Sequence, residues 1–316
     1  GSLLIMERDF HLSSVQEELI TSAILVGAVL GAVGVSWLSE RFGRRSAVMI
    51  VTAVFTTGAL ACSQAPDVTT LILARVYLGL AVGGSTQVVP TYISELAPAS
   101  QRGNLVTVFN VAIGVGIFLA NLIGFAMRES WGWRPMIAVA AGPAAFVFVC
   151  MFFMPRSPRW VAENEGLVPA LEQLGRVRSS RKLIRREITE IHDSVTGMED
   201  KERGWRGLMQ PWVRPALIAA LGTAFFTQAG GLEMMIYYTP TFLSDAGFGG
   251  ASALLTSLGV AAVYLVMTLL GCLLVDRIGR RRLMLIMGPG SVLSLLGLGL
   301  VFALHPAQGS VGSWLV

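Results

Sequence analysis

The sequence predicts an all-α protein that crosses a membrane several times. Of its 316 residues, 53% are apolar and 14% are charged, and the mean hydropathy is +0.64. A typical soluble domain is about 45–50% apolar and about 25% charged, so this chain cannot cover its surface with charge. That excludes a soluble globular enzyme, a disordered protein and a coiled coil. Apolar stretches about 20 residues long, the length that crosses a bilayer, recur along the chain, and basic residues gather in alternate connections.

Eight apolar stretches predict eight membrane-spanning helices. They cover residues 19–38, 47–63, 71–92, 105–127, 133–154, 214–243, 252–275 and 283–304. Their many Gly, Ala, Leu and Val residues suit helices that pack closely in lipid. Gly1 to Met6 resembles the end of an earlier span, and Trp314 to Val316 resembles the start of a later one. Because no signal-peptide region is visible, we interpret the chain as a piece of a longer polytopic protein that runs from late span 1 to the start of span 10.

Positive charges predict the orientation of these spans. Residues 39–46, 93–104, 155–214 and 276–282 hold 20 of the 24 Lys and Arg residues. Loops rich in Lys and Arg face the cytoplasm, so we expect these four to be cytoplasmic, in a cell (inner or plasma) membrane. We therefore divide the chain into an N-terminal bundle at 1–154, a cytoplasmic loop with short surface helices at 155–212, and an incomplete C-terminal bundle at 213–316.

Other chemistry finds little support in the composition. The three Cys and three His residues are too scattered for a disulfide framework or a metal site. The Gly-rich stretches lack a phosphate-loop Lys. The sequence shows no nucleophile–base pair of the kind that would indicate an enzyme. The basic loop alternates with acids and adjoins the membrane, which favours a cytoplasmic cap with anionic-lipid contact over nucleic-acid binding. We expect no metal, no cofactor, no nucleic acid partner and a monomer in the lipid bilayer.

Two predicted cytoplasmic loops repeat each other. Residues 39–45 read Ser-Glu-Arg-Phe-Gly-Arg-Arg, and residues 275–281 read Val-Asp-Arg-Ile-Gly-Arg-Arg. Gly43 and Gly279 permit a tight turn between two helices, and the acidic and basic side chains around them suit an ion-pair gate. A duplicated half is expected of a transporter built from parallel repeats, with its site near the bilayer midplane. The predicted gate residues are Glu40, Arg41, Arg44, Arg45, Glu95, Arg102, Asp276, Arg277, Arg280 and Arg281.

With these loops, further motifs make the chain resemble the sugar porter family of the major facilitator superfamily over nearly its whole length. The motifs are Arg75-x-x-x-Gly79, Pro90-x-Tyr92-x-x-Glu95-x-x-Pro98 with Arg102-Gly103, Gly132-Trp133-Arg134, Pro155-Arg156-Ser157-Pro158-Arg159-Trp160 and Tyr237-Tyr238-x-Pro240. The resemblance implies a major facilitator fold of two six-helix bundles, alternating access to a central site, no covalent chemistry and no organic cofactor. Arg156 stands where the family has Glu, and Ser36 and Cys272 stand where it has Gly before the loop acid, so the ion-pair network is expected to differ.

Two charges fall within predicted spans. A charge at such depth normally faces the bundle interior with a partner. By the resemblance, the partner of Arg75 in proton-coupled relatives is an Asp in span 1, at a position that would precede residue 1 of this sequence. Alternatively, Arg75 lies near the outer end of its span and its side chain reaches the membrane–water interface. Glu233 stands where the family has a sugar-binding Asn. It binds a polyol or sugar, titrates as a proton-coupling group, or is a structural ion-pair partner. Titration is an option because burial in a low-dielectric span raises the pKa of a carboxyl group.

The resemblance also implies a substrate site. Asn110 and Gln228 are amides at sugar-binding positions, and amides both donate hydrogen bonds to hydroxyls and accept them. Tyr264 stands where relatives have a sugar-contacting Asn, and either offers a hydroxyl and a flat apolar face or fills volume. Gly231 and the neighbouring Gly230 permit span 7 to bend. Tyr237 and Tyr238 either close over substrate or pack between helices, while Asn121 and Gln87 are weaker pore candidates.

The functional prediction is a secondary active transporter of a sugar or similar polyhydroxylated solute, with proton symport by alternating access. Its predicted partners are therefore a small hydrophilic solute, sugar or polyol, and protons. Facilitated diffusion and a non-sugar solute remain open as alternatives. So does a membrane sensor that binds solute without moving it, which would be expected to carry a long signalling tail.

Overall fold

The structure, a computed structural model, describes residues 6, 9–10, 12–98, 101–127, 132–178, 180–196, 207, 210–229, 231 and 250–304. Packing divides the chain into two compact units, each considered by itself. Unit 2 comprises Ser2–Val106 and Met127–Arg203, and unit 1 comprises Gly1, Thr107–Ala126 and Gly204–Val316. In the described residues all regular structure is helical, and seven segments are long and apolar enough to cross a membrane. The all-α polytopic prediction is confirmed.

Unit 2 is built around three long helices, α2 (Ser14–Phe42), α3 (Arg44–Gln64) and α4 (Val68–Leu96). Ser13 caps α2, because its hydroxyl accepts from the Gln16 backbone amide while the Gln16 side chain accepts from the Ser13 amide. Asp67 caps α4 in the same way, with its carboxylate 2.8 Å from the Thr70 amide. Helices α2 and α4 therefore begin where the sequence supplies an oxygen for their unpaired N–H groups, whereas α3 follows Gly43 without a side-chain cap.

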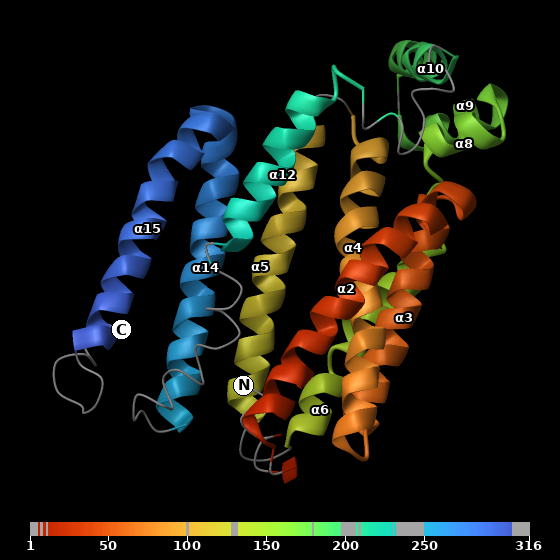
Figure 1. Cartoon of the computed structure of the whole chain (residues 1–316). Coiled ribbons are helices and arrows are strands. Elements are labelled where there is room, and N and C mark those ends of the chain that lie inside the picture. The colour runs from red at the N-terminus through yellow and green to blue at the C-terminus, as the bar shows by residue number, and fades with distance from the viewer. Residues whose placement is uncertain are drawn as a thin grey trace. The chain divides into compact units, whose positions relative to one another are not determined.

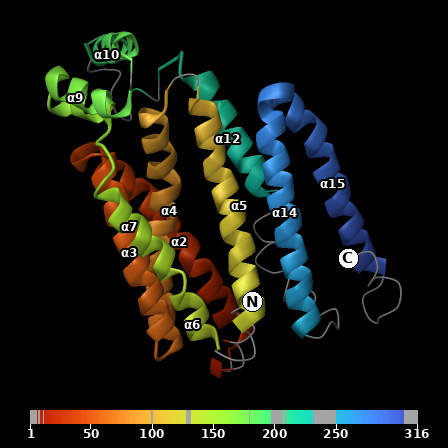
Figure 2. The same ribbon diagram turned by 180° about the vertical axis from the view of Figure 1, so that it is seen from behind.

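Glycines bring α2 and α4 into close contact. An ideal Cβ on Gly27 would lie 2.0 Å from the Val76 carbonyl oxygen, and one on Gly83 would lie 1.8 Å from the Ala28 carbonyl oxygen. No real side chain fits at those distances, so only glycine lets the two backbones approach this far. The packing role expected for these glycines is confirmed, and α2 and α4 lie side by side in Figures 1 and 2.

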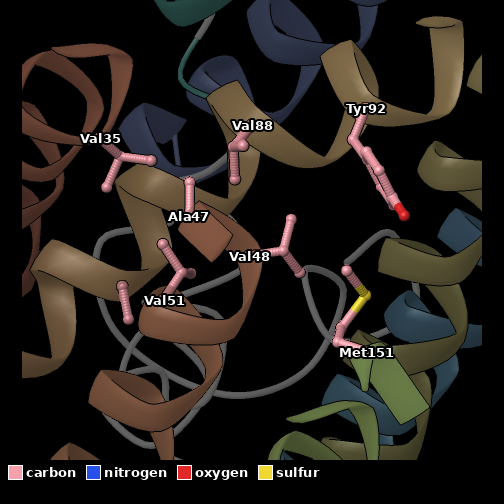
Figure 3. Packing of buried hydrophobic residues seen from close by; sticks show 8 residues of the cluster. Val35, Ala47, Val48, Val51, Val88, Tyr92 and Met151 are labelled. Carbon is pink, nitrogen blue, oxygen red and sulfur yellow. The ribbon is translucent and has the colours of Figure 1, made fainter. Parts of the chain in front are cut away.

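The core of unit 2 joins these helices to α7 (Ala141–Met151), which follows the short α6 (Trp133–Ala138). Figure 3 shows Val48 between Val88 and Met151, with the Tyr92 ring nearby. The predicted span at 133–154 is thus interrupted by a turn at Val139 and Ala140. Beyond it, α8 (Pro158–Asn164), α9 (Leu167–Val177) and α10 (Arg181–Thr196) are the short helices expected in the polar loop.

Unit 1 contains most of α5 (Arg102–Met127) together with α12 (Arg214–Ala229), α14 (Gly250–Ile278) and α15 (Arg280–Leu304). In Figure 1 α14 and α15 form a hairpin of two long helices. The predicted span at 214–243 is not one continuous helix: α12 ends at Ala229, and Gly231 adopts φ +71°. The Gly230-Gly231 pair explains this end, because glycine takes a positive φ without steric cost. Residues 232–249 lie outside the described part of the chain.

Candidate functional site

The turn at Gly43 positions the predicted gate residues. Gly43 alone separates α2 from α3 and has φ +87°. The Trp160 ring packs over it, with its atoms 3.2–3.4 Å from the place of a Cβ. The Trp160 indole Nε1 donates to the Glu40 carbonyl oxygen at 2.7 Å. Gly279 has φ +86° between α14 and α15, so the turn predicted from the repeated sequence is confirmed in both places.

A largely buried ion pair joins α3 to α4 at this end, which we call the Gly43 end of unit 2. Arg44 Nη2 and Nε lie 3.0 and 3.1 Å from Glu95 Oε1. Both side chains are largely buried, with 12% and 10% of their surfaces exposed. The Ser157 hydroxyl donates to the other Glu95 oxygen, so both carboxylate oxygens have partners. Little of the hydration of either charge remains, and each depends on the other.

Three further hydrogen bonds tie the end of α7 and the chain after it to the same end. Arg45 Nε and Nη2 donate to the carbonyl oxygens of Met151 and Phe152 at 2.9 and 2.8 Å. The Tyr92 hydroxyl donates to the Pro155 carbonyl oxygen at 2.6 Å. The Phe152 and Pro155 carbonyls lie beyond the end of α7, where the helix supplies no further N–H donors, and the Met151 carbonyl also accepts from the Met154 amide at 3.3 Å. Arg45 thereby works as a helix cap as well as a charge.

Arg156 is wired into the loop instead of into the Arg44–Glu95 pair. Its Nη1 lies 2.7 and 3.0 Å from the two Glu165 oxygens, and its guanidinium stacks on the Trp160 ring at 5.6 Å. Arg156 thus pairs with an acid nine residues later in the loop, and the expected effect of this residue on the gate stays a prediction.

Arg178 fastens the short helices to α4. Its Nε lies 3.0 Å from both Glu187 oxygens, and its Nη1 donates to the Leu96 carbonyl oxygen at 2.8 Å. Only 6% of its side chain is exposed. The sequence prediction missed Arg178, Ser157 and Trp160 as members of this cluster. The motif from Pro155 to Trp160 could have indicated Ser157 and Trp160. Nothing in the sequence of the basic loop indicates that Arg178 is the buried arginine.

Not all predicted gate residues come together. The prediction paired the loop acid with the loop Arg residues, but the Glu40 carboxylate is exposed and Glu95 holds Arg44 in its place. A one-residue turn brings the Glu40 backbone, and not its side chain, to the cluster. Arg41 is exposed and stacks on Trp37. The remaining exposed gate residues are Arg102, Arg277 and Arg281, and the side chains of Asp276 and Arg280 are outside the described set.

The opposite end of unit 2 holds Arg75. Its Nη2 lies 4.0 Å from the Met6 sulfur, within reach of a buried cluster that includes Trp133. The Trp133 indole donates to Asp9 at 2.8 Å, and the Arg134 guanidinium stacks on the same ring at 4.6 Å. Arg75 is half-buried and stands two turns inside α4, so its role in proton coupling stays a prediction.

The described substrate-site candidates all belong to unit 1. Asn110 is exposed on α5, four residues before Gly114, and an ideal Cβ on Gly114 would lie 3.7 Å from Tyr264 Cε1 on α14. The Gly231 amide donates to the Gln228 carbonyl oxygen at 3.0 Å, just after α12. Tyr264 on α14 thus lies next to α5 at Gly114, one helical turn from Asn110. Glu233, Tyr237 and Tyr238 lie outside the described residues.

Ligand sets for metals do not occur in the described ranges, where no three His, Cys, Asp or Glu residues form a group. The arrangement offers exposed amides on α5 and α12, a phenol beside α5, and paired charges at the Gly43 end. It offers sites for binding and for controlled contact between helices.

Comparison with known proteins gives one consistent result. Residues 5–315 match the family described as sugar (and other) transporter. The chain is 38% identical over 301 residues to the putative metabolite transport protein YwtG of Bacillus subtilis, covering 95% of this chain and 65% of that protein. It is 34% identical over 307 residues to the D-xylose transporter of Levilactobacillus brevis, covering 96% of this chain and 66% of that protein. The chain therefore spans about two thirds of the length of these relatives.

The fold agrees with a solved structure. The major facilitator superfamily proton:xylose symporter XylE, a protein of Escherichia coli, superposes with a TM-score of 0.82 at 26% identity, over 96% of this chain and 70% of that one. Together with the seven apolar helices, this fold identifies an integral membrane protein. The chain belongs to the sugar (and other) transporter family and has the major facilitator fold.

Proposed function

We propose that the protein is a secondary active transporter that carries a sugar or similar polyhydroxylated solute by alternating access, coupled to protons. The observation that carries the proposal is the family match over residues 5–315, joined with likeness to a D-xylose transporter and to a proton:xylose symporter. The proposal includes a cell-membrane location, the four basic loops in the cytoplasm, two six-helix bundles around a central site, and a monomer without covalent chemistry.

The proposed solute site combines amides, a phenol and one carboxyl group. Asn110 and Tyr264 supply hydrogen-bonding groups from neighbouring helices of unit 1, and amides and hydroxyls match the alternating donors and acceptors of a polyol. The predicted partners from the rest of span 7 complete the set. They are Gln228, Gly231, Glu233, Tyr237 and Tyr238.

The proposed gate uses the contacts at the Gly43 end. Arg44, Glu95 and Ser157 hold α3, α4 and the chain after α7 together. A cluster that is closed by charge pairs has two discrete states, paired and separated, and a transporter needs such two-state elements at its ends. We assign the exposed charges Glu40, Arg41 and Arg102 to the same gate, and the repeated loop around Gly279 adds Asp276, Arg277, Arg280 and Arg281 to the proposal.

Solute counterflow tests the proposal. The full-length protein is placed in liposomes loaded with one unlabelled pentose, hexose or polyol, and the uptake of the same labelled solute is followed. We expect transient accumulation for at least one sugar or polyol, because any transporter exchanges solute across the bilayer whether or not protons are coupled. A protein that binds a sugar but exchanges none would be a sensor, and a protein that exchanges only organic acids would overturn the choice of solute.

A further inference from the structure

Gly114 and Tyr264 meet where two long helices of unit 1 approach each other. An ideal Cβ on Gly114 would lie 3.7 Å from Tyr264 Cε1 and 3.3 Å from Leu265 Cδ1. Gly114 is the only buried residue of α5, a helix described from end to end. The rest of α5 is exposed or half-buried, so the helix is most deeply covered by protein at this level. Figure 2 shows α5 and α14 as neighbouring helices.

The contact lies at the middle of both helices. Gly114 is the thirteenth of the 26 residues of α5, and Tyr264 is the fifteenth of the 29 residues of α14. Both helices are long enough to cross the bilayer, so their midpoints lie near its midplane. Transporters of this architecture bind their solutes at that depth.

Polar residues flank the contact along both helices. Asn110 precedes Gly114 by four residues and Asn121 follows it by seven, which places all three on one face of α5. On α14, Ser257 and Ala261 are buried and lead to Tyr264 at the same helical spacing. A bare glycine on one helix therefore faces a large aromatic ring on the other, with Asn110 and Asn121 on the same face of α5.

We propose that Gly114 and Tyr264 act as one size-selecting pair. Gly114 leaves the volume into which the Tyr264 ring fits, and the ring then forms a wall at the solute site. A ring at that position takes more space than a small polar side chain, so the site admits a pentose-sized solute better than a hexose-sized one. This inference rests on the proposed function and adds to it the residue pair that sets solute size.

The volumes on the two sides are expected to depend on each other. A branched side chain on Gly114 would collide with the ring and push it toward the solute. Removing the ring would leave room for that side chain. Residues that share one volume show non-additive effects when both are changed, whereas distant residues add independently.

Transport by four forms of the full-length protein tests the pair: wild type, Gly114→Val, Tyr264→Asn and the double variant. We expect Tyr264→Asn to lower the ratio of kcat/KM for a pentose to that for a hexose about tenfold. One extra carbon group on a substrate changes discrimination by a pocket on about that scale. We expect Gly114→Val to raise KM for both sugars, and the double variant to recover toward Tyr264→Asn alone.

Controls separate this effect from misfolding. Gly116→Val changes the same helix at a position with no described atom within 4 Å, and it should leave the sugar ratio unchanged. Gly114→Ala needs only a small shift of the flexible Leu265 side chain and should fold. The unfolding temperature of all variants is measured in detergent. A change in the double variant that differs from the sum of the two single changes verifies the contact independently of any transport measurement.

Each outcome has a distinct meaning. Additive effects on the sugar ratio, or the same KM change from Gly116→Val, would overturn the pair. Coupled stability with an unchanged sugar ratio would also overturn it, because the contact would then be packing alone. If wild type exchanges no sugar at all, the proposed function fails first, and that result is visible before any variant is compared.

Discussion

At the scale of single residues, burial decides which charges matter. Arg44 and Glu95 are about nine-tenths buried, and their charged groups lie 3.0 Å apart. Arg159 and Glu163 form an ion pair of 3.3 Å in which 44% and 35% of the side-chain surfaces are exposed. Exposed pairs on one helix contribute about 0.5 kcal/mol, because water and salt screen them. Breaking a buried pair leaves an uncompensated charge and costs about 3–5 kcal/mol.

We therefore expect Glu95→Gln to destabilise the protein by about 3 kcal/mol, because it leaves the Arg44 charge without its counterion. Glu163→Gln is the matched control and should cost at most about 0.5 kcal/mol. Chemical unfolding in detergent measures both. Equal losses from the two variants would show that the Arg44–Glu95 pair is no more important than a surface pair.

A second residue-scale prediction concerns the cap of α4. The backbone amide and hydroxyl of Thr70 donate to the Asp67 carboxylate and hold its pKa below the ordinary value. A lowered folded-state pKa adds stability that is complete above the pKa of an unfolded aspartate, about 3.9. That stability is lost as the pH falls through the folded pKa.

We expect Asp67→Ala to lower the unfolding temperature at neutral pH, because the first turn of α4 loses its hydrogen-bond acceptor. Asp67→Asn keeps an acceptor and should lose less. The difference between wild type and Asp67→Ala should shrink below pH 4, which unfolding scans from pH 3 to 7 would detect. A constant difference across that range would rule out the charged cap.

At the scale of elements, the sequence predicts where helices lie better than where they end. The apolar stretches locate α2, α3, α4, α5, α14 and α15, and the repeated loops predict the turns at Gly43 and Gly279. Polar residues extend these helices beyond the apolar stretch, as at Glu40, because backbone hydrogen bonding continues until a glycine permits a positive φ. In span 7 the apolar pattern alone does not mark the end of α12, but the Gly230-Gly231 pair predicts a bend there, and Gly231 adopts a positive φ.

The two repeated turns allow a matched test of packing. Gly43 and Gly279 have φ +87° and +86°, but only Gly43 lies under a ring, that of Trp160. We expect Gly279→Ala to cost about 1 kcal/mol for the left-handed backbone alone. Gly43→Ala should cost more, because its Cβ must also displace Trp160. Thermal unfolding of the two variants measures the difference, and equal shifts would mean that Trp160 adjusts freely.

The docking of the short helices gives another element-scale prediction. Arg178 joins Glu187 on α10 to the Leu96 carbonyl at the end of α4, while Arg176 forms an exposed pair with Glu172. We expect Arg178→Ala to raise hydrogen exchange across residues 181–196, since α10 loses its buried anchor. Arg176→Ala should leave that exchange unchanged. Equal exchange in both variants would assign the docking to the apolar contacts of Ile188 and Ile191.

At the scale of the whole molecule, the sequence predicts the fold and family, but only part of the site. The loop repeats and spaced motifs identify the major facilitator architecture, which the likeness to XylE confirms. Which charges meet depends on tertiary packing: Glu95, 51 residues after Arg44 in the sequence, replaces Glu40 as the partner of Arg44. The contact of Gly114 with Tyr264 joins distant positions and leaves no mark in the sequence between them.

The most direct test of the account is sugar accumulation against a gradient. The full-length protein in liposomes is given an inward proton gradient and one labelled sugar that shows counterflow, with a protonophore as control. The account predicts accumulation above the outside concentration that collapses with the protonophore, and it predicts that Glu233→Gln keeps counterflow but loses accumulation. Equilibration without accumulation would contradict proton coupling, and no uptake of any sugar would contradict the account as a whole.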